Sequence, residues 1–77
     1  METEVFNFGE ALNQLREGKK VARIGWNGRG MWIELQVPTD LSKMTLPYIY
    51  MKTATDDLVP WLASQTDMLA DDWQIIN

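Results

Sequence analysis

The sequence predicts an α+β fold, in which one N-terminal helix packs on a small antiparallel β-sheet and a short second helix lies near the C-terminus. Apolar residues recur at helical spacing near the N-terminus, whereas later segments are rich in alternating, β-branched and aromatic residues between turn signals. A second helix-capping pattern occurs close to the C-terminus. With 77 residues, the chain is expected to form a single domain spanning positions 1–77.

The N-terminal helix is predicted over positions 7–18, NFGEALNQLREG. Asn7 is a favourable N-cap, and Glu10, three residues later, completes a capping-box pattern. Gly18 is typical of a residue that ends a helix. The side chains that form the apolar stripe of this helix are Phe8, Ala11, Leu12 and Leu15.

Two strands, KKVARIGW and MWIELQV, are predicted on either side of a glycine-rich turn. The second strand alternates cleanly, with Met31, Ile33, Leu35 and Val37 on one face. Asn27-Gly28 is the pair most typical of a type I′ turn and predicts a tight hairpin. Trp32 lies on the otherwise polar face, so we expect a partner chain, a ligand or a loop to cover it.

The rest of the chain is predicted to contain a second hairpin, a short helix and a final strand. Pro60 in the returning strand implies a sheet edge or a bulge. Ser64 and Asp67 repeat the capping-box spacing and open the short helix. The segments are a surface connection at 38–47, a strand at 48–53, an acidic turn at Thr55-Asp56-Asp57, a returning strand at 58–62, a helix at 64–70 and a strand at 73–76.

Composition argues against several classes of function. A net charge of −4 disfavours broad binding to DNA or RNA, which needs clustered Lys and Arg. With no histidine and no cysteine, a Ser–His or Cys–His nucleophile pair and cysteine-ligated zinc are excluded within one chain. No apolar run is long enough to span a membrane and the N-terminus lacks a signal-peptide pattern, so an intracellular protein is expected. So small a core predicts oligomerisation.

The aspartates are interpreted as structural residues, and we expect neither a metal nor a cofactor. Asp56-Asp57 suits a hairpin turn, and Asp67 suits the first turn of a helix. Asp71-Asp72 suits a solvated helix end.

Two short motifs are candidates for ligand binding. In GWNGRG, the turn explains Asn27 and Gly28, but Trp26 could stack a base and Arg29 could meet a phosphate. Ser64-Gln65-Thr66-Asp67 is either a helix cap alone or also a site for an anion. Spacing by itself favours the structural interpretation of each motif, a hairpin turn and a helix cap, over ligand binding.

The segments NFGEALNQLREGKKVARIGWNGRGMW and MKTATDDLVPWLASQTDMLADDW closely resemble the phage-encoded Thoeris anti-defence family of the second type. The resemblance extends over positions 6–76. Two features depart from the family pattern: the 38–47 connection is short, and Thr55-Asp56-Asp57 stands where an Asp-Gly turn is common.

The resemblance implies a sponge, which binds glycocyclic ADP-ribose made by the TIR-domain sensor of Thoeris immunity without cleaving it. It also implies no catalytic residues, a homotetramer with ligand sites between protomers, and action in the cytoplasm of the infected bacterial host. Some members bind cyclic dinucleotides at separate sites. Carried over by motif position, the ligand-binding residues are Trp26, Asn27, Gly28, Ser64, Gln65, Thr66 and Asp67. Arg29 is added as a candidate for phosphate on the strength of its charge alone.

The remaining large apolar residues are assigned to the core or to an interface: Phe8, Leu12, Ile33, Trp61, Trp73 and Ile75. The alternative function, from a different class, is a protein-interaction module that inhibits a host protein directly through a tryptophan-rich surface. A phosphodiesterase that uses an aspartate-bound metal is a third alternative.

Overall fold

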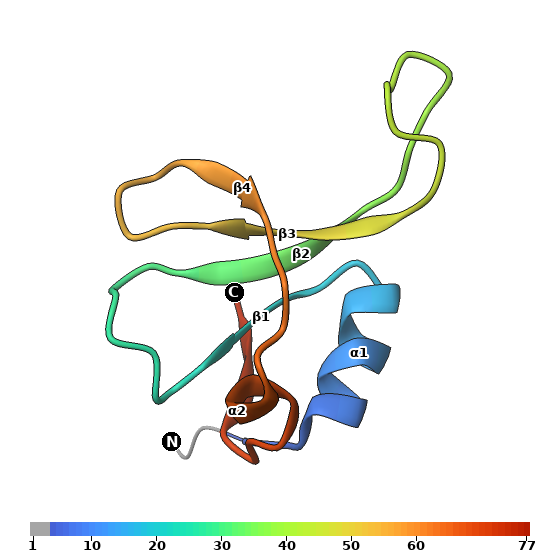
Figure 1. Ribbon diagram of the computed structural model, residues 1–77. Helices are drawn as coiled ribbons and strands as arrows, with labels where there is room; N and C mark the ends of the chain where they lie inside the picture. The colour runs from blue at the N-terminus through green and yellow to red at the C-terminus, as the bar shows by residue number, and fades with distance from the viewer. Residues whose placement is uncertain (1–3) are drawn as a thin grey trace.

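A computed structural model describes residues 4–77 and shows a helix against one face of a five-stranded sheet (Figure 1). A short second helix precedes the last strand, so the predicted α+β fold is confirmed. In chain order the elements are α1 (Phe8–Arg16), β1 (Lys20–Arg23), β2 (Trp32–Gln36), β3 (Tyr48–Lys52), β4 (Leu58–Pro60), α2 (Gln65–Met68) and β5 (Trp73–Ile76).

The sheet has the strand order β4-β3-β2-β1-β5, and all neighbouring strands are antiparallel. The last strand therefore pairs with the first, with Val21 opposite Ile75 and Arg23 opposite Trp73. Phe6 forms an additional bridge to Trp73. This pairing places the segment around α2 beside the loop that joins β1 to β2, although the two are far apart in sequence.

The helix α1 begins and ends where the sequence predicts, but only half of its capping box forms. Asn7 Oδ1 accepts a hydrogen bond from the Glu10 amide at 2.9 Å. The Glu10 carboxylate does not return the bond, because it accepts from Asn13 and Gln14 further along the helix. Gly18 has φ 86°, a conformation that glycine adopts without strain, and it ends the helix.

The core is small and lies between α1 and the sheet. Its fully buried side chains include Leu15 from α1 and Val21, Ile33 and Trp73 from the strands. The predicted assignments of Ile33 and Trp73 are thereby confirmed. The other residues assigned to the core or an interface are partly buried and pack against it: Phe8, Leu12, Trp61 and Ile75.

The connection between β2 and β3, residues 37–47, forms an arm that projects from the sheet (Figure 1). Hydrogen bonds between Thr39 and Ser42 hold the turn at its tip. Leu41 beside this turn is 97% exposed. Val37, predicted to face the core from β2, lies after the strand ends and is exposed, so that part of the prediction is wrong.

Pro60 lies in an edge strand of the sheet, and Trp32 lies in an inner strand. β4 is an edge strand, as Pro60 predicts. Trp32 is covered in part from within its own sheet, because Tyr50 packs edge-on against the indole and Lys20 Nζ lies 4.5 Å from the ring centroid. The expected cover of Trp32 is therefore partly supplied by neighbouring strands.

Candidate functional site

The two polar motifs singled out in the sequence meet in space. Trp26, in the loop between β1 and β2, donates a hydrogen bond from Nε1 to Asp67 Oδ1 in α2 at 3.1 Å. The two residues are 41 positions apart. Sheet topology brings them together, because β5, which follows α2, pairs with β1, which precedes the loop. We take this junction as the candidate site.

An aromatic cluster holds Trp26 in place. Its ring centroid lies 5.3 Å from that of Trp73 and 6.4 Å from that of Trp61, and both contacts are edge-on. Phe8 packs against Trp61 and Trp73 on the other side. Trp26 is half-buried, so its indole forms a fixed wall and not a freely exposed platform.

Arg23 joins the same junction, and the sequence reasoning missed it. Its Nη1 donates to Asp67 Oδ1 at 2.9 Å and its Nε donates to Asp72 Oδ1 at 2.8 Å. Asp72 Oδ2 also accepts from the Gly25 amide at 2.7 Å. The interpretation of Asp71-Asp72 as a solvated helix end is therefore wrong for Asp72, since a cation and a backbone amide engage its carboxylate.

A signal for Arg23 exists in the strand pattern. Val21 faces the core, so the alternation of a strand places Arg23, two residues later, on the same face. A cation that points toward a core requires an acidic partner. Pattern alone does not say which of the eleven acidic residues supplies it.

The charges at this junction shift one another's ionisation. The hydrogen bonds that Arg23 donates to Asp72 and then to Asp67 raise the pKa of Arg23. The hydrogen bond from Arg23 is the main cause that lowers the pKa of Asp72. For Asp67, desolvation is the largest influence and acts to raise the pKa, but hydrogen bonds from Arg23, Trp26 and Ser64 together outweigh it and lower the pKa. All three groups are thus held in their charged forms at neutral pH.

The predicted type I′ turn at Asn27-Gly28 does not form. A type I′ turn needs positive φ at both central residues, and Asp56, Gly18 and Gly30 are the residues with positive φ among those described. The connection between β1 and β2 spans residues 24–31 and is too long for a two-residue turn. At the start of this loop, Arg23 and the Gly25 amide both donate hydrogen bonds to Asp72, which precedes β5.

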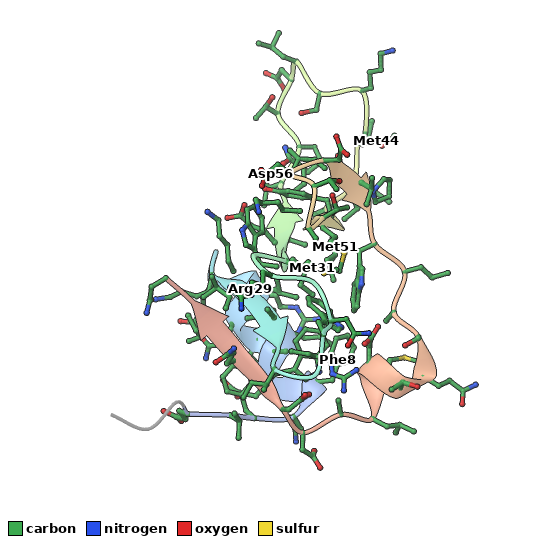
Figure 2. The ribbon with its side chains drawn as sticks, turned by 90° about the vertical axis from the view of Figure 1, so that its left-hand side faces the viewer. Phe8, Arg29, Met31, Met44, Met51 and Asp56 are labelled. Carbon is green, nitrogen blue, oxygen red and sulfur yellow. The ribbon has the colours of Figure 1, made fainter. Side chains whose placement is uncertain are left out.

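Gly28 serves close packing and not turn geometry. A Cβ atom on Gly28 would lie 2.3 Å from Met31 Sδ and 3.0 Å from Ala54 Cβ. Asn27 and Arg29 on either side are exposed, and Figure 2 labels Arg29 and Met31 along this loop. Within residues 4–77, no hydrogen bond joins Arg29 to Trp26 or to Asp67. The assignment of Arg29 to phosphate binding therefore stays a prediction.

The second motif forms the predicted capping box. Ser64 Oγ accepts from the Asp67 amide at 3.1 Å, and Asp67 Oδ2 accepts from the Ser64 amide at 3.4 Å. Gln65 and Thr66 are exposed between them. Because α2 has only four residues, it sums too few peptide dipoles to form an anion site by itself. The cap explains Ser64 and Asp67, and a ligand role for Gln65 and Thr66 stays a prediction.

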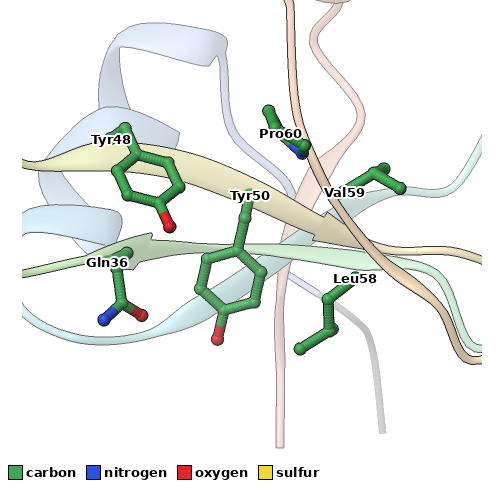
Figure 3. Close-up of a pocket in the computed structure, with 6 residues that line it drawn as sticks. All are labelled: Gln36, Tyr48, Tyr50, Leu58, Val59 and Pro60. Atoms are coloured by element: carbon green, nitrogen blue, oxygen red, sulfur yellow. The ribbon is translucent and has the colours of Figure 1, made fainter. Parts of the chain in front are cut away.

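Concave surfaces occur away from this junction as well. One pocket of about 180 Å³ lies on the sheet face opposite α1, lined by Gln36, Tyr48, Tyr50, Leu58, Val59 and Pro60 (Figure 3). Beside it, a hydrogen bond to Glu34 is the main cause that raises the pKa of Tyr50 to about 12. A larger cleft of about 500 Å³ opens between α1 and β3 and reaches Trp61. Sequence patterns do not predict either one.

The described residues supply few reactive groups. Within residues 4–77, no three acidic side chains gather closely enough to hold a metal ion. In the same part of the chain, no helix is long and apolar enough to cross a membrane. What the junction does offer is an indole wall, neutral polar side chains and a charge-balanced carboxylate.

Comparison with known proteins identifies a family and a curated relative that this chain resembles. The family model described as Tad2-like, a Thoeris anti-defense 2-like domain, matches residues 6–76. A curated relative, "Thoeris anti-defense 2" of Bacillus phage SP01, is 37% identical over 84 residues. That alignment covers 92% of this chain and 94% of the relative.

Proposed function

The chain belongs to the Thoeris anti-defense 2-like family, and on that premise we propose that it binds and sequesters, without cleaving it, a cyclic ADP-ribose-type messenger of Thoeris immunity. Family membership supports a phage anti-Thoeris role. The ligand we propose is glycocyclic ADP-ribose, held in the cytoplasm of the infected bacterium. Cyclic dinucleotides, at separate sites, are the second ligand class to test.

The observation that carries this proposal is the contact between Trp26 and Asp67. It joins the two motifs that the family resemblance assigns to the ligand. An indole face can stack on adenine. The exposed side chains of Asn27, Gln65 and Thr66 beside it can donate hydrogen bonds to ribose and pyrophosphate oxygens.

The hydrogen bonds that Asp67 accepts make it compatible with an anionic ligand nearby, although its carboxylate is negatively charged. A bare carboxylate would repel a pyrophosphate. Here Asp67 Oδ1 accepts from both Arg23 and Trp26, so its charge is balanced inside the protein. The carboxylate contributes by holding Trp26, and phosphate contact is left to the neutral donors.

Sequestration without cleavage also suits the chemistry of the junction. A general base works best when its pKa lies near the operating pH. The pKa of Asp67 is lowered from a value already acidic, so Asp67 is a poor base at neutral pH. The chain has no histidine or cysteine to replace it.

We propose self-association as the second part of the function, as a homotetramer with ligand sites between protomers. The chain has an accessible surface of 5794 Å², whereas a compact monomer of 8.9 kDa should expose about 4,800 Å². The excess, about 1,000 Å², compares with the roughly 800 Å² that each partner buries in a stable complex.

The arm supplies a surface of suitable chemistry for that contact. Leu41, Met44 and Leu46 are exposed on it. Asp40 and Lys43 cancel in charge, so the arm is neutral in a chain of net charge −4 and does not add to repulsion between copies. A second copy related by a two-fold axis can set Asp40 opposite Lys43.

Calorimetry against glycocyclic ADP-ribose tests the binding proposal. Trp26→Phe keeps aromatic packing but removes the Nε1 donor and reduces the stacking face, and we expect affinity to fall about tenfold or more. Trp32→Phe is the matched control, because Trp32 packs with Lys20 and Tyr50 on the opposite face of the sheet. Its affinity should equal that of the wild type.

The fate of the ligand tests the absence of cleavage. We expect intact messenger to be released when the loaded protein is denatured by heat. Release of a linear product would show that the protein is an enzyme. Equal binding by wild type and Trp26→Phe would show that the site lies elsewhere.

The alternative, inhibition of a host protein through a tryptophan-rich surface, has less support. Trp73 is fully buried, and the other three tryptophans are half-buried against one another or against Tyr50. A stable heterocomplex in pull-down, with no messenger bound, would favour it.

A further inference from the structure

The side chain of Arg23 is largely buried, so direct contact with a ligand does not explain its position. It lies at the end of β1 on the face that carries Val21, and its side chain is only 15% exposed. Two different nitrogens reach two different carboxylates, one in α2 and one just before β5. Arg23 therefore connects three segments, namely the β1–β2 loop, α2 and the start of β5.

The two carboxylates have all four of their oxygens engaged around this guanidinium. Asp67 Oδ1 accepts from Arg23 and Trp26, while Asp67 Oδ2 accepts from the Ser64 amide. Asp72 Oδ1 accepts from Arg23, and Asp72 Oδ2 accepts from the Gly25 amide. A rotation of either carboxylate would break at least one other contact.

Gly25 shows how closely the loop approaches this cluster. A Cβ atom on Gly25 would lie 2.9 Å from Asp72 Oδ2 and 3.2 Å from Arg23 Nη2. Trp26 is the next residue, so its backbone is fixed by the Gly25 contact and its ring by the Asp67 contact. Arg23 stabilises both through its two carboxylate partners.

We propose that Arg23 is a positioning residue for the ligand wall: it fixes Asp67 and Asp72, and through them it sets the orientation of the Trp26 indole, without touching the ligand itself. This inference rests on the proposed function for its effect on binding. It also predicts that lysine cannot replace arginine. An ammonium on a flexible stem cannot hold two carboxylates in the fixed directions that a planar guanidinium provides.

The test combines two measurements on Arg23→Lys. The first is the affinity for glycocyclic ADP-ribose, which we expect to fall about tenfold or more although the charge is kept. The second is the NMR resonance of the Trp26 indole N–H in the free protein. We expect it to shift and to exchange faster with solvent, while the indole resonance of Trp32, which packs with Tyr50 and Lys20 on the opposite face of the sheet, stays near its wild-type position.

Arg16→Gln is the control, because Arg16 lies at the exposed end of α1. It should leave both the affinity and the Trp26 resonance unchanged. If Arg23→Lys does not fold, Asp72→Asn provides the same test, because Asp72 is 31% exposed and its amide can still accept from Gly25. We expect effects of the same direction and smaller size.

The outcomes separate this inference from the proposed function. Wild-type affinity in Arg23→Lys, or an unmoved Trp26 resonance, would overturn the positioning role. If the wild type itself binds no messenger, the proposed function fails. The Trp26 resonance then still decides whether Arg23 orients the indole.

Discussion

Individual residues at the turns carry backbone conformations that most L-amino acids avoid. Gly18 and Gly30 have positive φ, which glycine tolerates. Asp56, with φ 68°, is the only residue other than glycine with positive φ among residues 4–77. Its side chain is 80% exposed and pairs with Lys52 at 2.8 Å. Such an exposed ion pair contributes little to the free energy of unfolding. It therefore offsets little of the cost of the left-handed backbone conformation at Asp56.

Two separate substitutions of Asp56, one by alanine and one by glycine, distinguish the effect of backbone strain from the effect of the lost charge. Both Asp56→Ala and Asp56→Gly remove the ion pair with Lys52. Only glycine relieves the left-handed conformation, so we expect the alanine variant to be less stable by about 1 kcal/mol. Urea unfolding measures the difference, and equal midpoints for the two variants would show that the turn readjusts freely.

At the scale of elements, the ion pairs of Arg23 connect the β1–β2 loop, α2 and the start of β5, and they matter most for α2. The four residues of α2 include no buried side chain. What holds α2 in place is the pairing of Asp67 with Arg23 and Trp26, together with the bond from Trp73 Nε1 to the Asp67 carbonyl. The position of α2 should therefore depend on the charge of these carboxylates.

Acid should weaken this junction. Because the folded-state pKa values of Asp67 and Asp72 are lowered, their contribution to stability is fully present above the unfolded pKa of about 4 and is lost as the pH falls below it. We expect Asp72→Asn to be less stable than the wild type at pH 7 and to lose less stability between pH 5 and pH 2. Thermal unfolding across this pH range measures both effects.

Parallel pH profiles for Asp72→Asn and the wild type would contradict the prediction. They would mean that the Arg23–Asp72 pair contributes no stability. Since both groups are partly exposed, the effect should also shrink at high salt.

At the scale of the whole molecule, the chain has more apolar surface than so small a core can cover. Leu41 and Leu46 lie on the arm, and Leu62 lies in the connection between β4 and α2 and is 92% exposed. Burial of the arm against a second copy would remove part of this surface from water. The extended shape of the molecule follows largely from this arm (Figure 1).

Substitutions on the arm test whether it mediates self-association. We expect the Leu41→Ser and Leu46→Ser double variant to have a lower mass in solution than the wild type at equal concentration. Leu62→Ser, which removes an equally exposed leucine away from the arm, should keep the wild-type mass. Light scattering after size-exclusion chromatography measures it. A wild type that is monomeric at every concentration would refute the self-association.

The sequence determined the type and order of the elements, because their signals are local. Asn7, the apolar stripe of α1 and Gly18 define the first helix within a dozen residues. The alternation around Ile33, the edge position of Pro60 and the capping box at Ser64 depend on neighbours only a few residues away. The fold class was therefore predictable, and Trp26 and Asp67 could be singled out as members of two motifs.

The tertiary structure alone decided how these motifs meet. Arg23 pairs with residues 44 and 49 positions away, and no local pattern indicates which carboxylate a half-buried guanidinium will find. A longer loop stands where a type I′ turn was expected, and Asp72, predicted to be solvated, accepts hydrogen bonds from Arg23 and from the Gly25 amide. Local propensity sets the elements, but the need to pair a charge that faces the core sets the geometry of the candidate site.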